Sequence, residues 1–181
     1  RQWNQHDHTS TDHGKIVRTL RAHSGIIHCI LVDDSSDHLL SSSIDESLCL
    51  WDLNTGQQLQ KFSVYSSYAC VLCKVDKSVF VCAGNDQCIN FWNIERNERI
   101  HTIGKAHSTR IQSLLYSKSN QVLISASFDM TVKVWDLKLE SAKSTQKYTI
   151  KNPFEKWCKS VAFLDGEKDG SRVLVGDDGG N

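Results

Sequence analysis

The chain of 181 residues carries 21 basic and 21 acidic side chains, so its formal net charge is zero, and 39% of its residues are hydrophobic. These values are ordinary for a globular protein, and they argue against a general nucleic-acid or anionic-membrane binder, whose affinity needs clustered Lys and Arg. No apolar run reaches the roughly 18 residues of a membrane-spanning helix, and the polar first residues do not predict a signal peptide.

The first part of the chain predicts a connection followed by short strands. Gln5–His13 holds three histidines (His6, His8 and His13), and we expect a solvated connection there in preference to a metal or phosphate loop. Gly14–Leu20 predicts a strand. Alternating apolar residues between Ser, Asn, Asp and Gly turns then predict four antiparallel strands. These are Ile26–Val32, His38–Ser43, Ser47–Asp52 and Gln57–Phe62.

The same period-two pattern continues to the end of the chain. After a second unit at Tyr65–Ile103, a third unit predicts the strands Ile111–Tyr116, Val122–Ser127 and Thr131–Trp135. The charged, Ser-rich segment Leu137–Gln146 predicts an exposed loop, and Tyr148–Ile150 predicts the strand after it. A further unit begins with predicted strands at Cys158–Phe163 and Arg172–Val175.

Four residue types recur at fixed spacing, which indicates a repeat protein. The intervals from His to Ser, Ser to Asp and Asp to Trp are 18, 4 and 6 residues in two separate units. The sets are His23, Ser41, Asp45, Trp51 and His107, Ser125, Asp129, Trp135. The second unit departs from this pattern, because only Asp86 and Trp92 keep their interval, and Cys82 occupies the serine position.

The opening His, the central Ser-x-x-x-Asp and the closing Trp-Asp resemble the WD40-repeat family. The resemblance implies an all-β fold, a β-propeller fragment with four-stranded antiparallel blades that makes up about half of a seven-bladed ring. It divides the chain into the end of a preceding blade (1–20), a repeat (21–62), a degenerate repeat (63–103), a repeat (104–151) and the start of another (152–181). We expect the remaining blades to lie outside this region.

The resemblance also gives the two four-residue sets a structural role, in which Asp, His, Ser and Trp join in a chain of hydrogen bonds across a blade. A Ser/His/Asp group invites a hydrolase interpretation as well. However, the set occurs twice, each serine lies within a predicted strand, and no Gly-x-Ser-x-Gly surrounds it. We therefore predict no catalytic residue, and we expect the second unit, which lacks the complete set, to be the softest blade.

The cysteines favour a reducing compartment. Seven is an odd number, and most of them fall inside predicted strands, as buried free thiols do. Cys70 and Cys73 have the spacing of half a zinc site, but residues three apart on a strand point to opposite faces and no second pair follows. We expect no metal, no cofactor and an intracellular location, either cytoplasmic or nuclear.

In this family, partners commonly bind one rim of the ring, formed just before the first strand of each blade and in the turn before the aspartate. Carried over, the resemblance implies a rim made of Ile26, His28, Ile44, Tyr68, Cys70, Asn85, Arg110, Gln112, Phe128, Trp157 and Lys159. Phe128 is unusual in a tight turn, where polar residues are the usual choice. Its side chain either packs on a neighbouring loop or is exposed to bind a partner protein.

The implied function is a non-enzymatic scaffold that docks other proteins in a multiprotein assembly, with no membrane partner and no direct nucleic-acid binding. Two alternatives stay open. A substrate receptor of a ubiquitin ligase is disfavoured, because no Arg stands two residues after any of the Trp-Asp or Trp-Asn pairs. The second alternative is a propeller fused to an enzyme domain.

Overall fold

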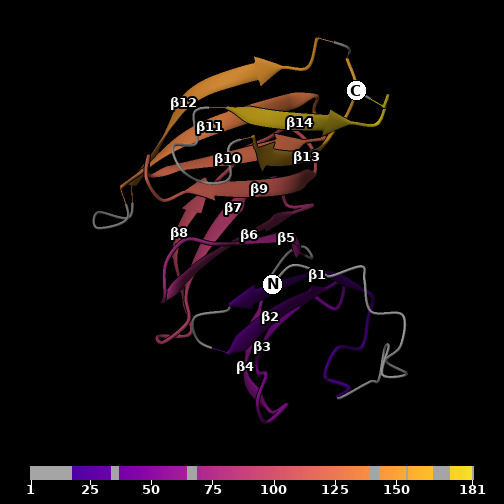
Figure 1. The fold of residues 1–181 in the computed structure, drawn as a ribbon, viewed down its shortest axis with the longest axis vertical. Helices are drawn as coiled ribbons and strands as arrows, with labels where there is room; N and C mark the ends of the chain where they lie inside the picture. Colours follow the sequence, from indigo (N-terminus) through magenta and orange to yellow (C-terminus); the bar gives the residue numbers. More distant parts are fainter. Residues whose placement is uncertain are drawn as a thin grey trace, which may run out of the picture.

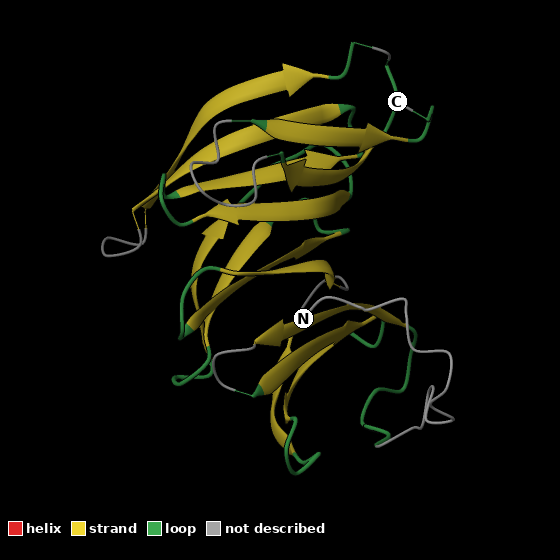
Figure 2. Cartoon of the chain, viewed as in Figure 1, coloured by secondary structure: helices red, strands yellow, loops and turns green. Residues whose placement is uncertain are grey.

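The computed structural model describes residues 18–33, 37–64, 69–138, 143–153, 155–164 and 172–180. Within these ranges the chain consists of strands, turns and loops, with no helix (Figure 2). No helix in this part of the chain is therefore long and apolar enough to cross a membrane.

The strands form three four-stranded antiparallel sheets and one two-stranded sheet, each in simple up-and-down order (Figure 1). The first sheet contains β1 (Ile27–Asp33), β2 (His38–Ser43), β3 (Ser47–Asp52) and β4 (Gln58–Ser63). The second contains β5 (Ala69–Lys74), β6 (Val79–Gly84), β7 (Ile89–Asn93) and β8 (Glu98–Ile103). The third contains β9 (Ile111–Ser117), β10 (Val122–Ser127), β11 (Thr131–Lys138) and β12 (Lys143–Lys151). The last pair is β13 (Cys158–Phe163) and β14 (Val173–Asp177).

The three four-stranded sheets follow one another in chain order along the long axis of the molecule (Figure 1). The first strand of each sheet contacts the first strand of the next sheet: β1 contacts β5, β5 contacts β9, and β9 contacts β13. The sheets therefore fan out from a shared inner edge, as the blades of a propeller do. We call them blades 1 to 4. The predicted all-β architecture of four-stranded antiparallel blades is confirmed.

Apolar side chains fill the spaces between blades, and β6 shows how. Its side chains alternate between the two faces of the sheet, because successive residues of a strand point in opposite directions. Phe80 and Cys82 pack toward blade 1, where the cluster also holds Phe62 and Leu48. Val79, Val81 and Ala83 pack toward blade 3 with Phe91, Ile111 and Leu123. All six residues of β6 are buried, so blade 2 is packed on both faces.

Two of the sequence-based strand predictions need correction. In the segment Gly14–Leu20, residues 14–17 lie outside the described ranges, and Arg18–Leu20 are not in a strand. An outer strand needs a partner strand, and the described part of the chain offers none at that position. Leu137–Gln146 is not a long loop, since β11 continues to Lys138 and β12 begins at Lys143. Backbone pairing of Asp136 with Thr145 and of Leu137 with Ser144 extends the hairpin, even though the side chains are polar.

Candidate functional site

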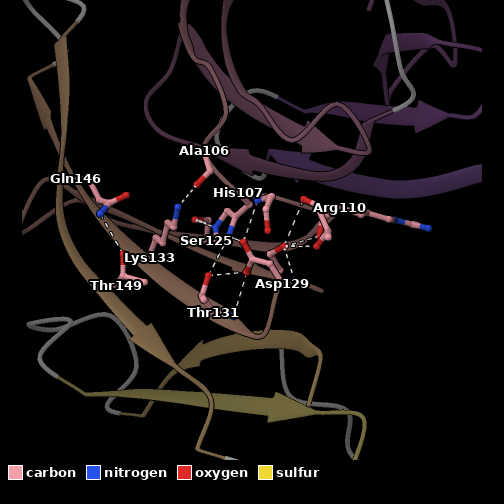
Figure 3. Close-up of polar contacts among 12 residues, drawn as sticks. Ala106, His107, Arg110, Ser125, Asp129, Thr131, Lys133, Gln146 and Thr149 are labelled. Atoms are coloured by element: carbon pink, nitrogen blue, oxygen red, sulfur yellow. Dashed lines mark hydrogen bonds and ion pairs between the residues drawn. The ribbon is translucent and has the colours of Figure 1, made fainter. Parts of the chain in front are cut away.

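In blade 3, the side chains of His107, Ser125 and Asp129 are joined by hydrogen bonds (Figure 3), and Trp135 is bonded to the same serine. The His107 Nδ1 atom is 2.8 Å from Asp129 Oδ2, and its Nε2 atom is 2.7 Å from Ser125 Oγ. The Trp135 indole N–H donates to the same Ser125 oxygen at 2.9 Å. With His107 Nδ1 as the donor to the carboxylate, Nε2 accepts from the Ser125 hydroxyl. Both ring nitrogens of His107, the Ser125 hydroxyl and the Trp135 indole N–H then each have a hydrogen-bond partner.

A fifth residue, Thr131, completes this network and was missed by the sequence analysis. Its hydroxyl donates to Asp129 Oδ1 at 2.6 Å, and its backbone N–H donates to the same oxygen at 3.0 Å. The Ser108 N–H donates to Oδ2 at 3.1 Å. Burial on its own raises the pKa of Asp129, but the hydrogen bonds from His107, Thr131 and Ser108 outweigh it and hold the pKa far below its usual range. The carboxylate is thus an ionised hub.

Blade 1 repeats the arrangement. Ser41 Oγ lies 2.7 Å from His23 Nε2 and accepts the Trp51 indole N–H at 2.9 Å. The two Asp45 oxygens lie 3.2 and 3.1 Å from His23 Nδ1, and the Ser47 hydroxyl donates to Oδ1 at 2.6 Å. Burial works against ionisation here too, yet the bonds from Ser47, the Ser24 N–H and His23 lower the pKa of Asp45. The residue two positions after each aspartate is a hydroxyl residue in both blades.

Blade 2 holds a different polar network, which the sequence analysis did not find. Asp86 Oδ2 accepts from the Asn90 side-chain amide at 3.0 Å, and Asn90 Oδ1 accepts from the Thr102 hydroxyl at 3.0 Å. The Trp92 indole nitrogen is buried without a hydrogen-bond partner in the part of the chain that the structure describes. Cys82 stands where serine stands in blades 1 and 3. Burial raises the pKa of its thiol to about 12, so the sulfur stays protonated and is only a weak acceptor for Trp92.

The turn after β2, β6 and β10 has one backbone conformation in all three blades. The residue after each aspartate has a positive φ, which is 61° at Glu46, 63° at Gln87 and 65° at Met130. A side chain in this left-handed region is disfavoured. The aspartate helps to hold the turn, because its Oδ1 accepts the N–H of the residue two positions further on in each blade. This N–H contact is therefore retained in blade 2, where the His-Ser-Trp part is missing.

Four of the predicted rim residues occupy β-bulges. In each blade the register between the first two strands shifts by one residue at the same point. The residue that the strand register skips at this shift is His28 in blade 1, Cys70 in blade 2, Gln112 in blade 3 and Lys159 in blade 4. Bulges commonly re-aim a side chain beside a functional site. The structure thus places these four side chains at equivalent positions on the innermost strands, near the end that carries the aspartate turns.

The rim between blades 3 and 4 carries an aromatic and cationic cluster. The rings of Phe128 and Trp157 are stacked, with centroids 4.8 Å apart and planes at 24°. The guanidinium carbon of Arg110 and the ammonium of Lys159 each lie 5.9 Å from the Phe128 centroid, within the range of cation–π contacts. Trp157 is 45% exposed. We call these four residues the aromatic–cationic platform. Phe128 therefore packs on the next blade.

The backbone shows that the platform residues hold equivalent positions in different blades. The Phe128 N–H donates to the Arg110 carbonyl at 3.1 Å, and the Asp178 N–H donates to the Trp157 carbonyl at 3.2 Å. In blade 1 the Ile44 N–H donates to the Ile26 carbonyl at 3.0 Å. The segment before the first strand and the turn after the second strand are thus tied together in all three cases.

The other predicted rim residues are less gathered. Ile26 and Ile44 are exposed at the end of blade 1, and Asn85 is exposed in the turn after β6. Tyr68 lies outside the described residues. Cys70 is half-buried beside Arg110, and burial raises the pKa of its thiol in spite of the nearby guanidinium. The Gln112 Oε1 atom is buried without a hydrogen-bond partner among the described residues.

The site offers no metal chemistry in the described part of the chain. No group of three or more His, Cys, Asp or Glu side chains there could hold a metal ion. All seven cysteines are free thiols. Burial raises the pKa of Cys73 to about 12, which leaves that thiol protonated and a poor nucleophile.

Comparison with known proteins finds matches in both sequence and structure. The model of the family "WD domain, G-beta repeat" matches residues 14–52 and 97–136. Cilia- and flagella-associated protein 52 of Chlamydomonas reinhardtii is 29% identical over 126 residues, which cover 67% of this chain and 20% of that protein. Human pre-mRNA-processing factor 17 is 26% identical over 125 residues, which cover 67% of this chain and 21% of that protein. A chain in the crystal structure of the mitotic checkpoint complex superposes with a TM-score of 0.78 at 18% identity, covering 91% of this chain and 50% of that one.

The fold and the repeated networks define a set of β-propeller blades. The matched repeats are those of blades 1 and 3, which hold the complete His, Ser, Asp and Trp sets. The chain contains two WD40 repeats, and it spans about a fifth of the length of these two curated relatives.

Proposed function

We propose that the chain is part of a non-enzymatic docking scaffold that holds proteins together in a multiprotein assembly through the rim. The observation that carries the proposal is the aromatic–cationic platform, where an exposed Trp157 ring and two cations lie at neighbouring positions of blades 3 and 4. Trp and Arg are the side-chain types most enriched at binding hot spots. The superposition on a chain of a multiprotein complex supports the same interpretation.

The two buried His-Ser-Asp-Trp sets support the non-enzymatic part of the proposal. Each serine oxygen already accepts a Trp N–H and contacts a His nitrogen, and each aspartate is held by its own turn. A catalytic serine needs an accessible oxygen and a neighbouring site for the substrate. Ser41 and Ser125 are buried, so we assign both sets to blade stability.

We propose the repeat boundaries 21–62, 63–103 and 104–151, and an intracellular location that suits the free thiols.

The test is partner capture with full-length protein from its native source. Arg110→Glu reverses one charge of the platform, and we expect it to weaken capture by about 1–2 kcal/mol, or by more if Arg110 is a hot spot. Phe128→Ala should act in the same direction, with some loss of stability because it removes the ring stacked on Trp157. Lys118→Glu is the matched control, since Lys118 is an exposed cation in the turn at the other end of β9.

Each variant is first compared with the wild type by thermal unfolding, so that misfolding is separated from lost binding. If Arg110→Glu and Phe128→Ala both retain every captured protein while they fold normally, the rim is not the docking face. An equal loss with Lys118→Glu would point to a general effect of charge and count against the platform.

A further inference from the structure

A polar groove lies on blade 3 at its boundary with blade 2. Its volume is about 540 Å³, within the range of about 300–1,000 Å³ that small-molecule sites occupy. Lys133 of β11 and Gln146 and Thr149 of β12 line it, together with Gln87 of blade 2 and Lys105 of the connection between the two blades. The rest of its wall is His107, Ser108, Asp129 and Thr131. None of the four platform residues lines the polar groove, so it is a separate site.

Lys133 is a cation at a position where the other complete blades hold neutral residues. The equivalent residues, two before the closing Trp, are Cys49 in blade 1 and Asn90 in blade 2, and both are buried. Lys133 is half-buried and extends toward Ala106, whose carbonyl accepts from its ammonium at 2.5 Å (Figure 3). The ammonium also lies 5.8 Å from the centre of the Trp135 ring. Since an ammonium carries three donors, it keeps donors for a ligand.

The two cations of the polar groove have no matching carboxylate within the described ranges. No ion pair there includes Lys133 or Lys105. Asp129 lies in the wall, but its oxygens accept from His107 and Thr131. Partial burial of an ammonium without a counter-ion costs free energy, and two like charges that line one cavity repel each other. An anion bound in the groove offsets both costs.

We propose that the polar groove binds a phosphate monoester, carried either by a small molecule or by a phosphorylated side chain. Such a group has a charge of about −1.5 to −2 at pH 7 and three strong acceptor oxygens, so the charges of Lys105 and Lys133 balance it. Lysine suits this ligand, because its compact ammonium binds phosphate as a point charge. The Thr149 hydroxyl accepts from the Gln146 amide at 3.0 Å, which leaves its own hydrogen to donate to a phosphate oxygen.

The test is isothermal titration calorimetry of the full-length protein with inorganic phosphate, in which sodium chloride keeps the ionic strength constant. We expect saturable binding. Lys133→Met and Lys105→Gln should each weaken it by about fivefold, because each removes one charge contact. Lys118→Gln, which removes an exposed cation at the other end of β9, is the matched control and should leave the affinity unchanged.

Three results overturn the proposal: no saturable binding to the wild type, an unchanged affinity in both groove variants, or an equal loss in the control. Thermal unfolding of each variant shows whether it folds. We expect Lys133→Met to fold, because Cys49 and Asn90 occupy the same strand position in their blades. Lys105 is exposed, so Lys105→Gln keeps the test decisive if Lys133→Met unfolds.

A second titration identifies what carries the phosphate. The probe is a glycine pentapeptide with phosphoserine at its centre, compared with its unphosphorylated form. Binding of the phosphopeptide in competition with inorganic phosphate supports a side-chain phosphate, and binding of inorganic phosphate alone supports a small molecule. Equal affinity of the two peptides overturns the phosphate assignment.

Failure of this proposal is distinguishable from failure of the docking function, because the two sites share no residue. Arg110→Glu, the platform variant, should leave the affinity for inorganic phosphate unchanged. If it lowers that affinity as much as Lys133→Met does, the anion does not bind in the polar groove. Lost partner capture in Arg110→Glu without saturable phosphate binding to the wild type would leave docking in place and refute the phosphate site.

Discussion

Asp129→Ala tests the assignment of the polar set in blade 3 most directly, because Asp129 is the hub of that set. The substitution removes the acceptor for His107 Nδ1, for the Ser108 N–H and for both donors of Thr131. The His107 side chain is fully buried, so its N–H cannot turn to water. The Thr131 hydroxyl, 3.2 Å from His107 Nδ1, can take over as acceptor and recover part of the loss.

The magnitude follows from these contacts. A hydrogen bond to a charged group contributes about 1.5–3 kcal/mol, and a buried donor left without a partner costs about 1–3 kcal/mol. The Ser108 N–H is exposed and regains water. We therefore expect Asp129→Ala to lower the free energy of unfolding by about 2–3 kcal/mol.

Asp86→Ala in blade 2 is the matched comparison. Asp86 accepts from the Cys88 N–H and from Asn90, and Asn90 keeps its bond to Thr102 after the substitution. We expect a loss of about 1 kcal/mol, the net value of ordinary hydrogen bonds. The assay is equilibrium urea unfolding of the full-length protein, followed by circular dichroism. An unchanged midpoint for Asp129→Ala would refute its role as hub. Equal losses at the two positions would refute the distinction between the blades.

Three further changes probe the same set. Because the folded-state pKa of Asp129 and Asp45 lies below the unfolded value of about 4, their stabilisation is full above that pH and is lost as the pH falls toward the folded-state pKa. Acid unfolding curves of wild type and Asp129→Asn should therefore converge at low pH, and curves that stay parallel would contradict this. Thr131→Val, which keeps the shape and removes the hydroxyl, should cost about 1 kcal/mol in urea unfolding. Ser125→Ala should cost about 1–3 kcal/mol, because the buried Trp135 N–H loses its acceptor; no loss would mean that water replaces the serine.

The spacing of His107, Ser125, Asp129 and Trp135 was enough to predict which side chains to look for in blade 3, since the same four types recur at the same intervals in blade 1. Thr131 was not predictable in the same way. The position two residues after the aspartate holds Ser in blade 1, Thr in blade 3 and Cys in blade 2, and hydroxyl residues are common in strands and turns. Only the three-dimensional distance to the carboxylate reveals its role.

The network of blade 2 left no pattern in the sequence. Asn90 and Thr102 are directly paired across β7 and β8. The corresponding pair in blade 3 is Lys133 and Thr149. Residues of such different types share no repeat signal, so the replacement network is visible only once the strands are in register. The expectation that blade 2 is the softest also depends on packing that sequence spacing does not show, because β6 is buried on both faces.

The turn that ends β10 links the buried set to the platform. Ser127 Oγ donates to the Arg110 carbonyl at 2.9 Å and accepts the Asp129 N–H at 3.1 Å. Phe128 lies between Ser127 and Asp129 in the sequence, and its own N–H donates to the Arg110 carbonyl. Its neighbour Asp129 is fixed by the interior of the blade, so the ring of Phe128 is held over the boundary with blade 4, where Trp157 covers it. We therefore expect the aspartate set to stabilise the blade and also to hold the rim in place, which would lower the entropy cost of the docking that we propose there.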